Sequence, residues 1–201
     1  MTPNPDGPRR IGLLGGTFDP PHLGHLVIAE VARVELDLDQ VQFVVAGQPW
    51  MKQRCSPSED RVRMVELAVA DDPAFHVNRS EIDRGCLTYT VDTLQELQAA
   101  ISGAELFFLV GEDAAANMPE WREVDKALEL ARFVMLTRPG YDVELDGPIL
   151  GRLERLTTPE IGISSTDLRA RFRQGRAVRH QLPDAVIDHI RAHSLYREDE
   201  G

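Results

Sequence analysis

Two histidines follow a pair of glycines near the beginning of the chain, in a spacing that favours phosphate chemistry. Residues 15–25 read Gly-Gly-Thr-Phe-Asp-Pro-Pro-His-Leu-Gly-His. His22 and His25 are three residues apart, so they share one face of the helix that is expected to begin here. Imidazoles in this position can donate hydrogen bonds to phosphate oxygens, and the unpaired N–H groups of a helix start also attract anions. Gly15 and Gly16 allow the backbone to come close to such a ligand.

The elements that must position these residues are a strand before them and a helix after them. Residues 11–14 are a short apolar run, and hydrophobic residues at helical spacing continue from Leu26 to Val34. Strand, glycine-rich turn and helix in this order build the phosphate site of many α/β proteins. The turn is not a Walker loop, because no Gly-Lys-Ser/Thr follows the glycines, and it lacks the Gly-x-Gly-x-x-Gly dinucleotide pattern. The alternative is a glycine-rich turn with two surface histidines.

A second polar cluster occurs near the other end of the chain, where residues 163–169 read Ile-Ser-Ser-Thr-Asp-Leu-Arg. Ser164, Ser165 and Thr166 are residue types that cap a helix, and Arg169 falls in the first turn that follows. Such a helix end offers hydroxyl groups, free N–H groups and a guanidinium to a triphosphate. Taken alone, the cluster fits an ordinary capped helix equally well.

The pattern of apolar runs predicts an α/β fold. Strands are expected at residues 11–14, 41–46, 75–78, 106–110 and 133–137. Helical periodicity is expected at about 57–70, 91–101, 120–131 and 183–192, and in a helix after Thr166 that stops near Gly175. The alternation implies a Rossmann-like, doubly wound parallel sheet flanked by helices, in a single domain with a small C-terminal helical portion. Ligands of such sheets bind beyond the carboxyl ends of the strands.

Two helix starts are predicted from their capping residues. Ser56-Pro57-Ser58-Glu59 matches the capping box, with proline at the first helical position. Thr90 is expected to cap the helix that carries Val91 and Leu94.

Length and composition indicate a globular protein. The chain has 201 residues, of which 42% are hydrophobic and 27% charged, and this suits one domain with a substantial core. We expect a flexible leader at residues 1–9, a folded domain at 10–196 and a tail at 197–201. Cys55 and Cys86 show no metal-type spacing, so no disulfide framework is expected and a reducing cytoplasm is the predicted location. No apolar run has the length of a membrane span.

The charge pattern favours a small phosphorylated ligand over a nucleic acid. The formal net charge is −11, whereas nucleic-acid-binding domains usually present a basic surface. Five arginines lie between residues 169 and 179 with no acidic residue among them. A local basic patch on an acidic protein suits a phosphorylated small molecule, and a solvated helix face is the alternative.

The two end motifs together resemble those of the nucleotidyltransferase superfamily. Residues 15–25 are similar to its T/HxGH signature, and residues 163–169 are similar to its ISSTxxR motif. The resemblance implies that ATP lies across the first strand–helix junction, with its phosphates at the histidines and at the second motif. The ATP-binding residues it implies are Gly15, Gly16, Thr17, Phe18, His22, His25, Gly111, Asp113, Ser164, Ser165 and Arg169.

The motifs between these ends resemble those of bacterial nicotinate-mononucleotide adenylyltransferases, over nearly the whole chain from about residue 10 to 196. They are residues 46–52, which end in Lys52, and residues 83–94, 111–113 and 138–140. The resemblance implies that Thr88, Tyr89 and Trp121 form the pocket for a pyridine nucleotide and that Asp113 binds an ATP ribose. The alternatives are a core position for Trp121, a helix cap for Thr90 and a turn for Asp113.

Three positions depart from the pattern of this family. Cys86-Leu87 stands where Gly-Pro or Gly-Gly is usual, Glu112 replaces the alanine of Gly-Ala-Asp, and Trp50-Met51-Lys52 replaces Pro-Pro-His-Lys. These changes leave the residues implied for adenylyl transfer intact. They affect the expected preference between closely related substrates.

The reaction implied by the resemblance joins ATP and nicotinate mononucleotide to give deamido-NAD and pyrophosphate. The nucleophile is an ionised phosphate, so no general base and no protein nucleophile are needed. His22, His25, Lys52 and Arg169 are the expected catalytic residues, acting by alignment and charge stabilisation. Mg²⁺ is expected to arrive with ATP, with no dedicated metal site on the protein. The expected partners are the two substrates, without nucleic acid or membrane, and a homo-oligomer is compatible with the sequence.

Two other readings stay open at this point. A related transferase could use another acceptor, such as phosphopantetheine or a cytidylyl-transfer substrate. A non-catalytic nucleotide-binding protein could keep the same fold. The nature of residues 88–90 and Trp121 favours a pyridine nucleotide over the first alternative, and the full set of phosphate-binding side chains opposes the second.

Overall fold

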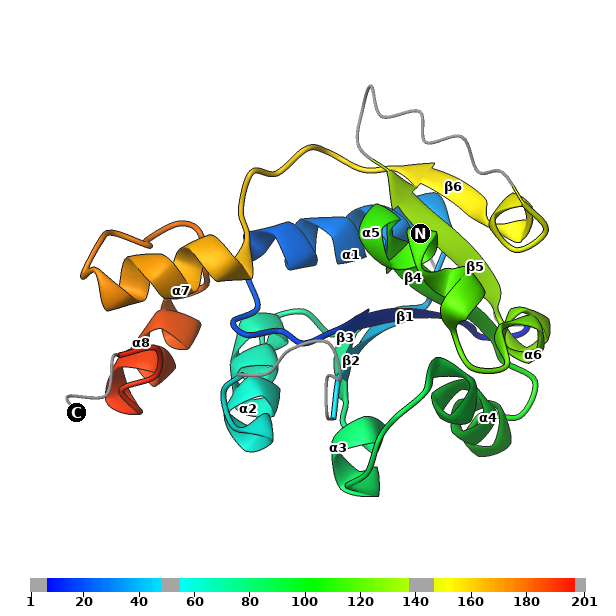
Figure 1. Ribbon diagram of the computed structural model, residues 1–201, viewed down its shortest axis with the longest axis horizontal. Helices are drawn as coiled ribbons and strands as arrows, with labels where there is room; N and C mark the ends of the chain where they lie inside the picture. The colour runs from blue at the N-terminus through cyan, green and yellow to red at the C-terminus, as the bar shows by residue number, and fades with distance from the viewer. Residues whose placement is uncertain (1–6, 48–54, 138–146, 198–201) are drawn as a thin grey trace.

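The computed structural model describes residues 7–47, 55–137 and 147–197 (Figure 1). These residues form one six-stranded sheet. Its strands are β1 (Arg10–Gly16), β2 (Gln40–Val45), β3 (Phe75–Asn78), β4 (Glu105–Gly111), β5 (Arg132–Thr137) and β6 (Glu154–Thr157). Every pairing between neighbours is parallel, so the expected parallel sheet is confirmed.

The strand order is β3-β2-β1-β4-β5-β6. The chain therefore builds outward from β1 in one direction, crosses back, and continues from β4 in the other, which confirms the doubly wound topology. The reversal lies between β1 and β4, where Leu14 is in register with Leu109. The five predicted strands are confirmed, and β6 is an additional edge strand. Its sequence, Glu-Arg-Leu-Thr, has no apolar run by which it could be predicted.

The described residues form eight α-helices. They are α1 (Leu23–Glu35), α2 (Ser58–Val69), α3 (Ser80–Arg84), α4 (Thr90–Ala100), α5 (Glu112–Ala116), α6 (Val124–Leu130), α7 (Ser165–Arg173) and α8 (Asp184–Ala192). Short 3₁₀ turns occur at Met118–Glu120 and Leu150–Arg152.

The predicted caps of α2 and α4 are wrong. The N-cap residues are Pro57 and Tyr89, and neither helix start has a side-chain capping bond. The backbone of Ser56 instead forms two hydrogen bonds with side chains. Its N–H donates to Asp19 Oδ2 at 3.1 Å, and its carbonyl accepts from Arg61 Nε at 3.1 Å. A tertiary contact therefore overrides the local capping preference at this position.

The helix predicted at 120–131 begins later than expected. Trp121 is extended and Glu123 has a φ of 49°, in the left-handed region, so α6 starts only at Val124. Helix α5, which directly follows β4, and helix α3 are absent from the predicted elements. Each has only five residues, too few for helical periodicity to be read from the sequence.

The two faces of the sheet bury separate hydrophobic clusters. Ile11 and Leu13 of β1 contribute to a cluster with α4 and α6, whereas Leu14 of the same strand contributes to a cluster with α1 and α2. This alternation is the period of two that a strand imposes on its side chains. Strands buried on both faces read as continuous apolar runs, which is why the central strands could be predicted.

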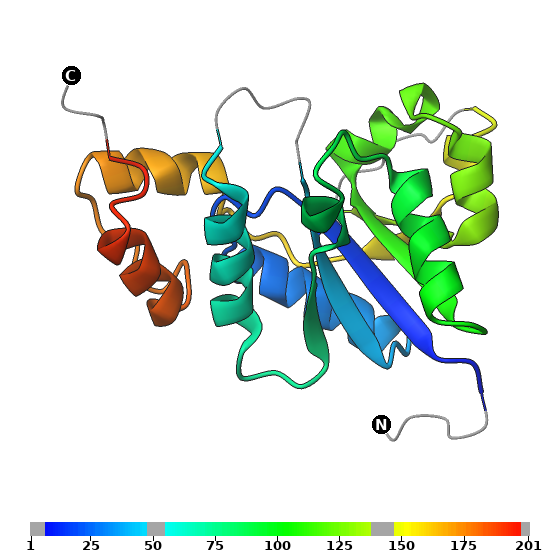
Figure 2. The ribbon, with the colours of Figure 1, turned by 90° about the horizontal axis from the view of Figure 1, so that it is seen from below.

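The C-terminal helices form a third cluster at one end of the molecule. Figures 1 and 2 show α7 and α8 beside α2, with α4 and α6 at the opposite end. Met64 of α2 packs with Leu168 of α7 and with Val186 and Ile190 of α8. This arrangement confirms the small helical portion expected at the C-terminus.

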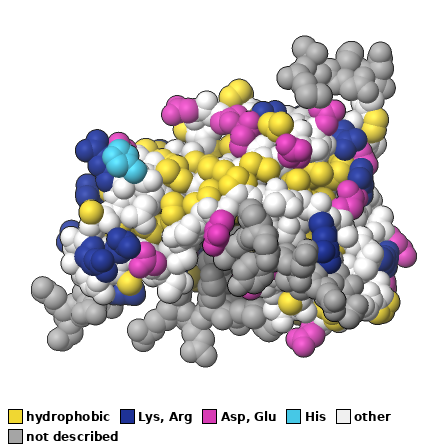
Figure 3. Space-filling view, turned by 90° about the horizontal axis from the view of Figure 1, so that it is seen from above, with side chains coloured by type: hydrophobic (Ala, Val, Ile, Leu, Met, Phe, Trp, Pro, Cys, Tyr) yellow, Lys and Arg dark blue, Asp and Glu magenta, His cyan; other side chains and the backbone are white. Residues whose placement is uncertain are grey.

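The surface carries both hydrophobic and charged side chains. Figure 3 shows a hydrophobic band that crosses one face of the molecule. Cys55 and Cys86 are both free, in agreement with the sequence, and none of the described helices has the length and apolar character needed to span a membrane. A homo-oligomer and a cytoplasmic location stay predictions.

Candidate active site

The residues of the first motif lie at the carboxyl edge of the sheet, beside the topological switch point. Gly15 and Gly16 end β1, and Gly111 ends the adjacent β4. Gly15 and Gly111 are exposed, and a Cβ at Gly111 would meet no atom within 4 Å. This edge is where nucleotides bind in doubly wound sheets.

The second motif contacts the first directly. Ser165 Oγ donates to the carbonyl of Pro20 at 2.9 Å, and Arg169 Nη1 donates to the carbonyl of Asp19 at 2.7 Å. Ser164 is the N-cap of α7, and its Oγ accepts from the N–H of Asp167 at 3.2 Å, as predicted. The structure therefore brings the two motifs together and points the N-terminus of α7 toward the loop after β1.

The two histidines form a stacked pair at the start of α1. Their ring centroids are 3.8 Å apart with an interplanar angle of 26°. The backbone N–H of His22 donates to Nδ1 of His25 at 3.2 Å. Because Nδ1 accepts in this bond, the proton of the neutral His25 ring resides on Nε2, which is then a hydrogen-bond donor. The Phe18 and His25 rings form a T-shaped contact, at 5.1 Å between centroids, which holds the orientation of the His25 ring.

His22 is almost fully buried, with 7% of its surface exposed. Burial lowers the pKa of His22 to about 4, because the charged ring loses its hydration. Its Nδ1 has no hydrogen-bond partner within the described residues. A Cβ at Gly24 would lie 2.9 Å from this atom, so only glycine fits beside the ring. His22 is therefore a neutral, tightly enclosed imidazole at pH 7.

Lowering the pH is expected to destabilise the protein through His22. The unfolded chain protonates this ring near the ordinary pKa of 6.5, and the folded protein resists protonation until about 4. Between these values the unfolded state binds more protons, so the free energy of unfolding falls as the pH falls. We expect His22 to account for about 2 kcal/mol of this loss at pH 5. Urea denaturation at pH 7.5 and pH 5 should show a correspondingly smaller loss in His22→Asn, and equal losses in both proteins would contradict the assignment.

Asp19 is a residue of the first motif to which the sequence analysis assigned no role. Its side chain is 3% exposed, and its Oδ1 accepts from the hydroxyl of Tyr196 at 2.6 Å. Burial and the neighbouring Asp19 carboxylate raise the pKa of Tyr196, which therefore stays protonated and donates. Asp19 also accepts from the N–H of Ser56 through Oδ2. The C-terminal end of the fold is thus tied to the loop that carries the histidines.

Arg61 is a second residue that sequence reasoning missed. It lies on α2 with 1% exposure, and the described residues include no ion-pair partner for it. Its guanidinium donates to four backbone carbonyls, those of Thr17, Ala46, Gly47 and Ser56, at 2.7–3.1 Å. Within the described residues its charge is therefore held by carbonyl dipoles, with no carboxylate within 4.0 Å, and it contacts the loop after β1 through Thr17. The signal in the sequence is an arginine at the apolar spacing of Val65 and Val69, since residues four apart share a helix face.

The residues expected for a pyridine nucleotide are close to one another but differ in environment. Thr88 Oγ1 donates to Glu81 Oε2 at 2.7 Å, and Tyr89 is half exposed. Trp121 packs edge-on against Phe108, at 6.2 Å between centroids, at the margin of a core cluster. Trp121 is therefore partly a core residue, as the alternative interpretation held.

Arg122 joins the two halves of this region. Its guanidinium carbon lies 4.7 Å from the centroid of the Tyr89 ring, and its Nη1 lies 3.8 Å from Asp92 Oδ2. This stacking brings the segment around Tyr89 next to the segment around Trp121. The guanidinium is about half exposed, so it presents a positive charge at the place where the pyridine ring is expected. No role could be predicted for Arg122, because one exposed arginine after a tryptophan has no distinctive pattern.

Other predicted site residues have particular placements. The Phe18 side chain is 2% exposed and belongs to the core, so only its backbone is available to a ligand. Asp113 is exposed in the first turn of α5, and Thr17 uses its carbonyl to bind Arg61. Residues 48–54, which include Lys52, and residues 138–140 lie outside the described residues.

Comparison with known proteins identifies the family of the chain. A family model described as cytidylyltransferase-like matches residues 13–171. A probable nicotinate-nucleotide adenylyltransferase of Thermus thermophilus is 47% identical over 188 residues, covering 94% of this chain and 100% of that protein. The chain belongs to the nicotinate-nucleotide adenylyltransferase family. A relative in Corynebacterium glutamicum with the same description is 46% identical over 197 residues, covering 94% of this chain and 89% of its own.

Solved structures agree with the nicotinate-nucleotide adenylyltransferase fold. The structure of Plasmodium falciparum nicotinic acid mononucleotide adenylyltransferase complexed with NaAD aligns with a TM-score of 0.75, covering 94% of this chain and 97% of that one. The sequences are 18% identical in this alignment, so the likeness concerns the fold. It confirms the Rossmann-like architecture that the apolar pattern predicted.

Proposed function

We propose that this protein transfers the adenylyl group of ATP to nicotinate mononucleotide, forming deamido-NAD and pyrophosphate in NAD biosynthesis. The observation that carries the proposal is the direct contact between the two motifs, through Ser165 and Arg169, at the carboxyl edge of β1. Membership of the nicotinate-nucleotide adenylyltransferase family supports the same reaction.

The chemistry requires alignment and charge stabilisation. A phosphate oxygen of nicotinate mononucleotide attacks the α-phosphorus of ATP, and the bond from that phosphorus to the bridging oxygen of the β-phosphate breaks. Pyrophosphate leaves with the electron pair, and no proton needs to be removed from the nucleophile. Mg²⁺ enters with ATP as part of the substrate and neutralises charge on its phosphates.

We assign the phosphate contacts to residues that face the loop after β1. His25 is oriented to donate through Nε2, and His22 is held beside it as a neutral ring. Arg169 and Ser164 supply a guanidinium and a hydroxyl group at the start of α7, and Ser165 holds this helix start against the loop through its bond to the Pro20 carbonyl. The positive charge of Arg61, which contacts the same loop through Thr17, adds attraction for anions. Lys52 keeps its expected role as a further phosphate ligand.

We assign the pyridine nucleotide to the region of Thr88, Tyr89, Trp121 and Arg122. Aromatic side chains suit stacking with a flat ring, and free backbone N–H groups can bind a carboxylate. Arg122 adds a positive charge that favours nicotinate over the neutral nicotinamide.

The direct test is pyrophosphate release from ATP and Mg²⁺ with three acceptors measured separately: nicotinate mononucleotide, nicotinamide mononucleotide and phosphopantetheine. We expect strong preference for the nicotinate form. Activity with phosphopantetheine alone would show that nicotinate mononucleotide is not the acceptor, whereas the proposed nucleotidyl transfer would still hold. ATP binding without pyrophosphate release from any acceptor would favour a non-catalytic protein.

Replacing Arg122 by glutamine is expected to reduce the preference for nicotinate. The ratio of kcat/KM for nicotinate mononucleotide to that for nicotinamide mononucleotide should fall by about tenfold, because a charge-assisted contact to the carboxylate is lost. The value for nicotinamide mononucleotide itself should change little. Lys126→Gln is the matched control, since this exposed lysine of α6 pairs with Glu123 at the surface. An unchanged ratio of the two kcat/KM values in Arg122→Gln would show that Arg122 does not contact the nicotinate carboxylate.

A further inference from the structure

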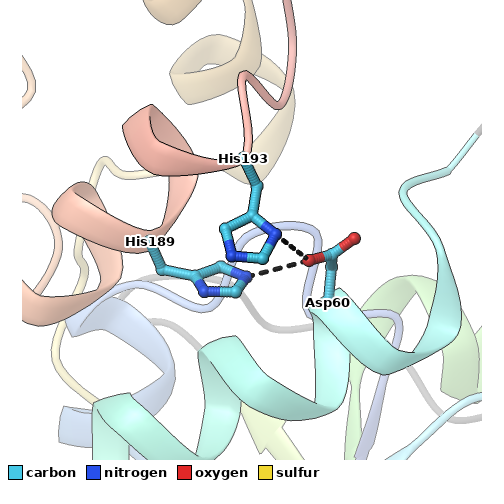
Figure 4. Close-up of side chains that lie close together, drawn as sticks. All are labelled: Asp60, His189 and His193. Carbon is cyan, nitrogen blue, oxygen red and sulfur yellow. Dashed lines mark hydrogen bonds and ion pairs between the residues drawn. The ribbon is translucent and has the colours of Figure 1, made fainter.

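A cluster of metal-binding side chains lies where α2 meets α8, outside the proposed nucleotide site. Asp60 comes from the first turn of α2, and His189 and His193 come from the last part of α8 and its end (Figure 4). Asp60 Oδ1 lies 3.0 Å from His189 Nε2 and 3.2 Å from His193 Nδ1. All three donor atoms lie within 4.8 Å of one another.

The chemistry of these donors fits a divalent transition metal. Imidazole nitrogen and carboxylate oxygen are ligands of Zn²⁺, at about 2.0–2.2 Å from the ion, and two histidines four residues apart on a helix are a common spacing of zinc ligands. The two separations from Asp60 Oδ1, 3.0 Å to His189 and 3.2 Å to His193, are compatible with those bond lengths in a tetrahedral arrangement. In Figure 4 each of the two rings turns a nitrogen toward the same oxygen of the Asp60 carboxylate, so the three donor atoms lie side by side.

Burial divides the cluster into an enclosed side and an open side. The His189 side chain is 9% exposed and Asp60 is 19% exposed, whereas His193 is 52% exposed. A pocket of about 310 Å³ adjoins the cluster and opens to solvent. An ion can therefore enter from solvent and keep a water molecule as its fourth ligand, while two of its protein ligands are held in place by packing.

The surrounding charges do not oppose a cation. Arg63 and Arg79 line the same pocket, but Arg63 pairs with Glu66 at 2.9 Å and Arg79 pairs with Glu59 at 2.9 Å. The two basic groups are thus balanced by two acidic groups. The Asp60 carboxylate supplies the remaining negative charge at the centre of the cluster.

We propose that Asp60, His189 and His193 bind one Zn²⁺ ion, which clamps helix α8 to helix α2. The same pair of helices is connected to the active-site loop through Tyr196, which follows α8 and donates to Asp19. Bound zinc therefore stabilises the docking of the C-terminal segment on the fold, without contacting the substrates. This proposal does not depend on the identity of the substrate.

The test is a titration of Zn²⁺ into the metal-free, untagged full chain without nucleotide, followed by calorimetry. We expect one ion per chain in the wild type. His193→Gln and Asp60→Asn should weaken binding by at least about 100-fold, since loss of an outer partner alone costs roughly 10–100-fold. His193 is exposed, so its replacement is not expected to prevent folding. His76→Gln, which changes an exposed histidine on β3, is the matched control and should bind like the wild type.

Thermal denaturation gives a second readout that is independent of stoichiometry. Saturating Zn²⁺ should raise the Tm of the wild type and of His76→Gln, because an ion that binds only the folded state stabilises it. The Tm of His193→Gln should not respond. Absence of zinc binding in the wild type, or equal binding in wild type, His193→Gln and Asp60→Asn, would overturn the proposal and leave the cluster as hydrogen bonds between Asp60 and two histidines.

Discussion

His25→Ala is expected to lower kcat by about a hundredfold or more, the cost of removing one preorganised donor in comparable oxyanion sites. The His25 ring accepts a hydrogen bond from the backbone N–H of His22 through Nδ1 and forms a T-shaped contact with the Phe18 ring. Its Nε2–H is thus oriented before substrate arrives, and the donor needs no reorganisation when charge develops at the α-phosphate. Steady-state kinetics with ATP and nicotinate mononucleotide measures the loss.

The division of this effect between kcat and KM tests the assignment. A donor that acts in the transition state changes kcat, whereas a donor that only binds ATP changes KM. His25→Gln, which keeps an N–H donor on a flexible side chain, should recover part of the rate. His76→Ala is the control, because His76 is exposed on β3 and has no place in the site. A near-normal kcat in folded His25→Ala would exclude His25 from charge stabilisation.

The parts of this protein that follow regular periodicity could be predicted from the sequence. Strands β1, β2, β4 and β5 are continuous apolar runs because both of their faces are buried. The two nucleotide motifs could be located because each combines a distinctive string with a helix start. Their contact through Ser165 and Arg169 follows from the topology, since both lie at the carboxyl edge of β1.

The parts that could not be predicted depend on contacts between distant segments. β6 is a polar strand that pairs with β5 at the edge of the described sheet, and the late start of α6 follows from backbone conformations at Trp121 and Glu123. Asp19 receives Tyr196 from the far end of the chain. Local propensity carries no information about such partners, and the wrong caps at Ser56 and Thr90 have the same origin.

The role of Arg61 could not be predicted from the sequence. Its replacement has the largest expected effect on the free energy of unfolding. Arg61→Met keeps a long side chain but removes every donor to the carbonyls of Thr17, Ala46, Gly47 and Ser56. Each buried acceptor left without a partner costs about 1–3 kcal/mol, so we expect a loss of at least about 3 kcal/mol in the free energy of unfolding. Urea denaturation at pH 7.5 measures this loss.

Arg63→Met is the matched control on the same helix. Arg63 is 56% exposed and forms a surface pair with Glu66, so its replacement should change the free energy of unfolding by less than about 1 kcal/mol. Arg61→Lys should recover only part of the stability, because an ammonium cannot reproduce the planar set of donors that reaches four carbonyls. Similar losses of unfolding free energy in Arg61→Met and Arg63→Met would mean that water molecules take the place of the hydrogen bonds that Arg61 donates to the carbonyls.

Arg61 is also expected to affect the use of ATP as a substrate, because it holds the segment around Thr17 and the segment around Gly47 in fixed positions relative to each other. It binds the carbonyl of Thr17 in the first motif and that of Gly47 at the end of β2, where a Cβ would lie 2.5 Å from the carbonyl oxygen of Glu81. At a temperature where Arg61→Lys is folded, misplacement of these segments should still lower kcat/KM for ATP by about tenfold or more. If Arg61→Lys is less stable but fully active, Arg61 stabilises the fold and has no role in positioning the nucleotide. A variant with both defects would show that one buried cation stabilises the fold and positions the nucleotide at the same time.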